Sequence, residues 1–178
     1  AEAHNNLGSA LQQKNQLENA LNSYKKSITL KPDFAQAHNN LGILYQKLGN
    51  IELAFLSYEK AVSFDPSYAL AHFNLSAVKK YTINDPQIIQ MQTILSSASI
   101  SHSNRVHLSF ALAKAYEDLG SQDELFKFLD EGNRLRKEEL NFSLDEPENQ
   151  NIIIKNLFNS TPSILSELTN EPLIIKPI

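Results

Sequence analysis

The chain contains no cysteine among its 178 residues. This absence excludes disulfides, thiolate catalysis and zinc–thiolate sites. A chain without cysteine is compatible with a reducing compartment, and its N-terminus lacks the basic-then-apolar pattern of a signal peptide. We therefore expect a cytoplasmic protein.

Long apolar runs are absent too, since no segment approaches the roughly 20 residues that cross a bilayer. The net charge is −4 and the sequence pI is about 5.7, which argues against a nucleic-acid footprint. The five glycines are isolated, so no glycine-rich turn is present that would hold phosphates. We expect no membrane partner, no nucleic-acid partner and no cofactor.

What the chain does contain is a fixed period. The segments His4-Asn-Asn-Leu-Gly8, His38-Asn-Asn-Leu-Gly42 and His72-Phe-Asn-Leu-Ser76 each follow the previous one by 34 residues. A period of this length indicates stacked helix pairs rather than one globular core. Such arrays usually work by presenting a surface, which favours a binding module over an enzyme.

Turn signals divide the chain into units. Apolar residues recur at helical spacing on both sides of residues 14–16 in the first unit and of Gly49-Asn50 in the second. Pro32 and Pro66 close these units, because proline cannot continue a helix but can begin the next segment. We predict two regular units over 1–67, divergent units over 68–100 and 101–140, and C-terminal helices with a strand-like tail over 141–178.

The repeated positions resemble the tetratricopeptide pattern over residues 1–76. The matching positions are Leu7/Leu41/Leu75, Gly8/Gly42, Ala20/Ala54, Tyr24/Tyr58 and Pro32/Pro66, with His4, His38 and His72 where the family usually has tryptophan. The resemblance implies an all-α fold, a right-handed superhelix of stacked antiparallel helix pairs with extra C-terminal helices. It also implies a protein-binding function.

A second resemblance covers about the last 70 residues. The stretch 107–137 and the terminal PLIIKPI look like the linker of bacterial tetratricopeptide sulfotransferases. The resemblance implies a sulfotransferase-family parent whose catalytic domain follows Ile178. Since the first motif begins abruptly at Ala1, we expect a piece of a longer protein that has no catalytic site of its own.

Asparagines are the sharpest site candidates. Asn6, Asn40 and Asn74 recur at the period, and Asn5 and Asn39 lie beside them. Amides in a row on the concave face would offer donors and acceptors to the backbone of an extended peptide. The row resembles the asparagine ladder of O-linked N-acetylglucosamine transferase repeats. The alternative is that these amides bond within the array.

Other polar residues receive structural interpretations. Stacked helices about 8–10 Å apart would keep the three periodic histidines too far from one another to share a metal, so we expect none. Adjacent carboxylates on a helix point about 100° apart and form no acid–base pair by themselves. The basic cluster Arg134, Arg136 and Lys137 is expected to form salt bridges with Glu131, Glu138 and Glu139 rather than face an anionic partner.

The leading hypothesis is a module that recognises an extended protein segment in its concave groove. The alternative is a structural docking or dimerisation region of the parent enzyme, with no ligand of its own. Its partner would then be the missing catalytic domain, or a second copy bound through an apolar face at Leu7 and Leu11. A weaker third hypothesis is a free-standing adaptor unrelated to sulfation. Under the leading hypothesis, replacing Asn6, Asn40 and Asn74 with alanine weakens peptide capture and leaves thermal stability nearly unchanged.

Overall fold

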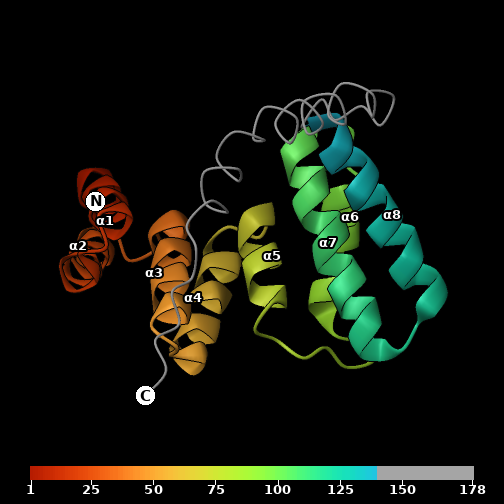
Figure 1. The fold of residues 1–178 in the computed structure, drawn as a ribbon, viewed down its shortest axis with the longest axis horizontal. Helices are drawn as coiled ribbons and strands as arrows, with labels where there is room; N and C mark the ends of the chain where they lie inside the picture. The colour runs from red at the N-terminus through yellow and green to blue at the C-terminus, as the bar shows by residue number, and fades with distance from the viewer. Residues whose placement is uncertain (140–178) are drawn as a thin grey trace, which may run out of the picture. The chain divides into compact units, whose positions relative to one another are not determined.

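The computed structural model describes residues 1–139, which form eight α-helices and no strand within that range (Figure 1). The expected all-α architecture is confirmed. The C-terminal helices and strand-like tail expected over 141–178 lie outside the described residues. The helices are α1 (Glu2–Gln13), α2 (Leu17–Leu30), α3 (Ala35–Lys47), α4 (Ile51–Phe64), α5 (Ala69–Ser76), α6 (Pro86–Leu95), α7 (His102–Leu119) and α8 (Gln122–Glu139).

The first two units are regular helix pairs. Helix α1 packs on α2 and α3 packs on α4, while α2 and α1 both contact α3 and so join the units. The turns inside the pairs contain Asn15 and Gly49, whose φ angles are 59° and 78°. Glycine and asparagine adopt this left-handed conformation most readily. The turns therefore fall where the sequence predicted them, one period apart.

A tyrosine ring lying on a glycine brings the two helices of each regular pair together. A Cβ atom added to Gly8 would lie 2.6 Å from the nearest ring atom of Tyr24, and one added to Gly42 would lie 2.5 Å from Tyr58. The hydroxyl of each tyrosine donates a hydrogen bond back to the first helix, to Gln12 at 3.0 Å and to Gln46 at 2.8 Å. In the third unit Ser76 replaces the glycine and Gln92 replaces the tyrosine.

Histidines secure the junctions between units. The Nε2 atom of His38 lies 2.8 Å from the carbonyl oxygen of Pro32, and that of His72 lies 2.9 Å from the carbonyl of Pro66. Both rings are buried. Each histidine thus binds the first helix of its unit to the proline linker before it.

The third unit departs from the regular pairing. Its first helix, α5, packs against α4 and α7, and its second helix, α6, also packs against α7. The residues between them, 77–85, are not helical. Helix α6 begins at an Asp-Pro pair: Asp85 caps it by accepting from the backbone N–H of Gln87, and Pro86 occupies the first helical position.

The last described pair, α7 and α8, closes the larger core. Leu108, Leu112 and Phe128 pack there with Tyr81 and Met91. Helix α8 runs on to Glu139, and Lys137 stands two periods and three residues after Pro66, where a proline would have ended it. Two of the three basic residues form the expected salt bridges: Arg134 pairs with Glu131 and Glu138, and Arg136 pairs with Glu139, whereas Lys137 pairs with no carboxylate within residues 1–139.

The glycine–tyrosine contact predicts that Gly42→Ala destabilises the protein. The added methyl group would overlap the buried ring of Tyr58, and overpacking of this kind costs about 1–3 kcal/mol. Alanine's better helix propensity offsets at most about 1 kcal/mol of that. Thermal unfolding followed by circular dichroism should show a lower Tm.

Tyr58→Ala provides the control, since it removes the ring that the methyl group would strike. In that background Gly42→Ala should be neutral or stabilising. Equal destabilisation in both backgrounds would mean that the ring does not set the helix spacing.

Candidate functional site

The structure separates the five candidate asparagines into two classes. Asn6, Asn40 and Asn74 lie at position six of their units, on α1, α3 and α5, and they are exposed or half-buried. Asn5 and Asn39 lie at position five and are only 2% and 0% exposed. The predicted row therefore consists of three amides at the surface, Asn6, Asn40 and Asn74, and two amides in the interior, Asn5 and Asn39.

Hydrogen bonds connect the two classes across each unit junction. The Nδ2 of Asn40 donates to the Oδ1 of Asn5 at 3.0 Å, and the Nδ2 of Asn74 donates to the Oδ1 of Asn39 at 2.9 Å. Position six of one unit thus reaches back to position five of the unit before it. The alternative considered from the sequence, bonding within the array, accounts for these donor groups.

The carbonyl oxygens of Asn40 and Asn74 remain as acceptors. Within residues 1–139 no protein group donates to either oxygen, and both residues are partly exposed. A carbonyl oxygen has two lone pairs and matches a backbone N–H. The side chain of Asn6 forms no hydrogen bond in the same range, so both its oxygen and its nitrogen remain available to a ligand.

The interior amides change one sequence-based expectation. Replacing Asn40 or Asn74 with alanine would leave the buried oxygen of Asn5 or Asn39 without its donor. An unpaired buried polar group costs about 1–3 kcal/mol. Nearly unchanged stability is therefore expected only for Asn6→Ala, and we expect the triple replacement to lower the Tm as well as weaken binding.

The structure also contains two grooves on the second-helix side that the sequence analysis missed. The first groove, about 470 Å³, lies between α2 and α4 above α3. The second groove, about 540 Å³, lies between α4 and α6 above α5. Corresponding lining residues are one period apart, as in Ile28 and Val62 or Leu41 and Leu75. That pairing was the available signal, but it required knowing which helices become neighbours.

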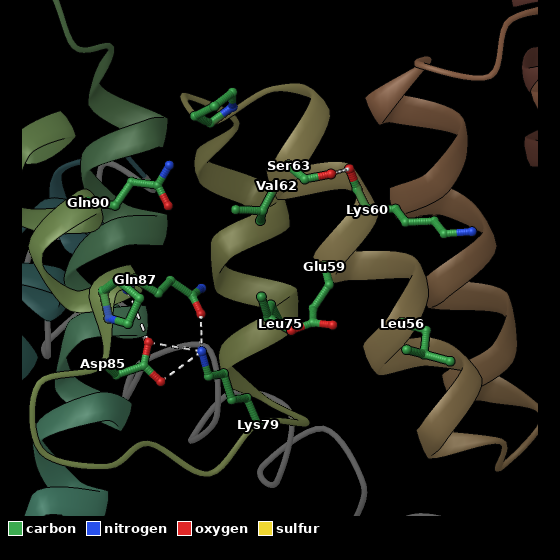
Figure 2. A pocket seen from close by; sticks show the side chains of 12 residues that line it. Leu56, Glu59, Lys60, Val62, Ser63, Leu75, Lys79, Asp85, Gln87 and Gln90 are labelled. Atoms are coloured by element: carbon green, nitrogen blue, oxygen red, sulfur yellow. Dashed lines mark hydrogen bonds and ion pairs between the residues drawn. The ribbon is translucent and has the colours of Figure 1, made fainter.

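A polar network of Lys79, Asp85 and Gln87 lines one side of the second groove (Figure 2). Lys79 pairs with Asp85 at 2.8 Å and donates to the Oε1 of Gln87 at 3.1 Å. The Nε2 of Gln87 lies 3.1 Å from the Nδ1 of buried His72. Because Nε2 of His72 donates to Pro66, Nδ1 must accept from Gln87, which requires the neutral ring. The network joins α5 to α6 where their backbones have little contact.

Burial lowers the pKa of His72, and the nearby charge of Lys79 lowers it further, while the Pro66 hydrogen bond and Asp65 act in the opposite direction. Burial also lowers the pKa of His38. Residues 1–139 contain no group of three or more histidine or carboxylate side chains that could hold a metal ion. No helix in this range is long and apolar enough to span a membrane.

These lowered pKa values predict that acid destabilises the fold. Below the unfolded histidine pKa of about 6.5, the unfolded state binds more protons than the folded state, so unfolding is favoured as the pH falls. The stabilisation is complete above that pH and is lost below it. We expect a lower Tm at pH 5 than at pH 7.5.

His72→Asn should reduce this pH dependence, because it removes one of the contributing groups. The measurement is the change in Tm between the two pH values for each protein. An equal change in the variant and the parent would show that His72 does not contribute.

Comparisons with known proteins agree with this architecture. The family described as "TPR repeat" matches residues 8–49, and the family "Tetratricopeptide repeat" matches residues 35–68. An uncharacterized protein from Aquifex aeolicus (strain VF5) is 30% identical over 91 residues. The match spans 51% of this chain and only 12% of that relative.

Among solved structures, a mutant O-GlcNAc transferase from Thermobaculum terrenum has a TM-score of 0.47 and 24% identity, over 63% of this chain and 22% of that chain. The TPR2B domain of yeast Sti1, in a pHsp70 complex, has a TM-score of 0.45 and 20% identity, over 75% of this chain and 95% of that chain. Taken together, the family matches and the helix pairs show that residues 8–68 are similar to tetratricopeptide repeats, a unit typical of protein–protein interaction.

Proposed function

We propose that this chain is a protein-binding module that holds an extended peptide along α1, α3 and α5. The observation that supports this proposal is the row formed by Asn6, Asn40 and Asn74, called here the amide row. Two of its members are bonded to the unit before them through Nδ2. Their remaining oxygens are available to accept backbone N–H groups of a ligand.

The cross-unit bonds favour binding because they order the side chains in advance. An asparagine that is free in solution loses rotamer freedom when a ligand fixes it, at a cost of about 0.5–1.5 kcal/mol for a flexible side chain. Asn40 and Asn74 are each held at one end by a buried partner. Much of the ordering cost has therefore been met during folding.

The repeat spacing indicates which backbone conformation fits. Packed helices lie about 8–10 Å apart. Three residues of polyproline II span about 9.3 Å and return the backbone to the same orientation, with its N–H unpaired. Three residues of β-strand span about 10 Å but point the N–H to the opposite side. A polyproline II ligand would thus place every third N–H opposite the amide row.

Two finer interpretations from the sequence remain proposals. The sulfotransferase parent rests on sequence resemblance alone, and in the described part of that segment the apolar side chains of α7 and α8 fill the core. The coding sequence after Ile178 tests it. The docking or dimerisation alternative is supported by Leu7, which is 49% exposed. Leu11 does not support it, because its side chain packs against the core of the first two units around Tyr24 and Leu44.

Paired variants test the amide row. Peptides would be selected on the full chain from a phage-displayed library of random 12-residue sequences, and their Kd values measured by isothermal titration calorimetry. Asn74→Ala and Asn39→Ala break the same hydrogen bond from its two sides. Only Asn74→Ala also removes the surface acceptor, so we expect a loss in affinity of about tenfold, or 1.4 kcal/mol, for that variant alone.

Asn6→Ala should weaken binding without lowering the Tm, because Asn6 is exposed. Equal loss of affinity in the Asn74 and Asn39 variants would attribute the effect to instability. Unchanged affinity in Asn6→Ala and Asn74→Ala would exclude the amide row as the binding site.

Scanning a selected peptide with N-methyl amino acids tests the spacing. Each N-methyl group removes one N–H donor from the peptide backbone. We expect loss of binding at positions three residues apart and tolerance between them, measured as Kd by the same titration. Loss at every second position would indicate a β-strand instead.

A further inference from the structure

The first groove carries positive charge that no salt bridge within residues 1–139 neutralises. Lys25 from α2 and Lys60 from α4 are the only charged side chains among its lining residues, and both are exposed. Neither forms a salt bridge within residues 1–139. The groove therefore carries two formal positive charges although the whole chain is acidic.

The second groove provides an internal comparison one period later. Glu59 stands there at the position of Lys25, and Lys79 is paired with Asp85. Its four charged lining residues, Glu59, Lys60, Lys79 and Asp85, sum to zero. The two grooves thus share their place in the repeat and both include Lys60 and Leu56 among their lining residues. They differ in net charge because Lys25 lines only the first, whereas Glu59 and the Lys79–Asp85 pair line only the second.

Apolar side chains of the first groove are also left uncovered. Ile28, Leu41, Leu53 and Leu56 are among its lining residues, and Leu53 and Leu56 remain 44% and 47% exposed. In the second groove the residues one period after these two leucines are Gln87 and Gln90. Exposed apolar area with a charged rim is characteristic of a protein interaction site.

We propose that the first groove binds an amphipathic helix of a partner protein. Its apolar side chains would cover Leu53 and Leu56, and its carboxylates would pair with Lys25 and Lys60. Charge complementarity selects an acidic partner and repels a basic one. A groove between two helices above a third accommodates a further helix, the recognition mode in which an amphipathic helix places its apolar face in a hydrophobic groove.

This surface is separate from the amide row. The groove is lined from α2, α3 and α4 by residues that include none of the five candidate asparagines. An acidic helix could therefore bind while the first-helix face is occupied. The inference does not depend on the proposed peptide function.

Two synthetic helical peptides test the charge selection. Both would carry leucines at positions i, i+4, i+7 and i+11 of a 15-residue helix, and they would differ only in having glutamate or lysine at the flanking positions. NMR spectra of the ¹⁵N-labelled full chain should show that the glutamate peptide shifts amide resonances of Ile28, Leu53 and Leu56. Its affinity should exceed that of the lysine peptide at least tenfold and fall as salt is added.

Two double variants with the same change in net charge test whether the peptide selectivity comes from the lysines of the first groove. Lys25→Glu with Lys60→Glu should abolish binding of the glutamate peptide and permit binding of the lysine peptide. Lys14→Glu with Lys26→Glu makes the same change in net charge at exposed positions outside the groove and should leave binding unaltered.

Equal binding of the two peptides, equal effects of the two double variants, or binding of neither peptide would each overturn the proposal. Shifts confined to Asn6, Asn40 and Asn74 would also overturn it, because they would place the helix on the amide row. A duplex DNA oligonucleotide that shifts the groove resonances more than the glutamate peptide does would show that the lysines serve a nucleic acid instead.

Discussion

The contact between a tyrosine ring and a glycine backbone is the constraint on which the repeats depend. At Gly8 and Gly42 even a methyl group would overlap the ring of Tyr24 or Tyr58. The two helices of a unit therefore approach at one fixed place and at a distance that the ring sets. Since this contact recurs after 34 residues, consecutive units present equivalent residues in equivalent directions. In the first two units this equivalence places Asn6 and Asn40 at corresponding positions of the amide row.

Polar contacts then fix how one unit sits on the next. The periodic histidine binds the carbonyl of the preceding proline linker, and the position-six asparagine binds the position-five asparagine of the preceding unit. Hydrophobic packing tolerates sliding, whereas a buried polar group that slips out of register loses its partner at a cost of about 1–3 kcal/mol. These contacts specify the stacking register. The same requirement explains why asparagine at position six combines a structural donor with a free acceptor.

The fold could be predicted from the sequence because a 34-residue period is typical of stacked helix pairs. The turns at Asn15 and Gly49 could be predicted because asparagine and glycine favour the left-handed conformation that these turns require. The sequence could not separate Asn39 from Asn40, since neighbouring helical residues differ by about 100° in direction and only the contact with the preceding unit decides which is interior. The shift of α5 toward α7 was equally hidden. It coincides with the loss of the glycine–tyrosine pair at Ser76 and Gln92, which shows in the sequence only as a weakened pattern. The grooves required knowledge of which second helices become neighbours.

The third unit also sets a limit on the proposed peptide site. Position five of that unit is Phe73, whose side chain has no oxygen that could accept a hydrogen bond from a following unit. Its ring packs against the larger core, with its centroid 5.6 Å from that of His107. The cross-unit amide bonds therefore end at Asn74 in the described residues, just where α5 turns to pack on α7. Three amides define two intervals. In polyproline II geometry, two intervals correspond to about six residue steps and about 19 Å of peptide. The amide row would thus contact a bound peptide over roughly seven residues. Any selectivity beyond that length would have to come from another surface.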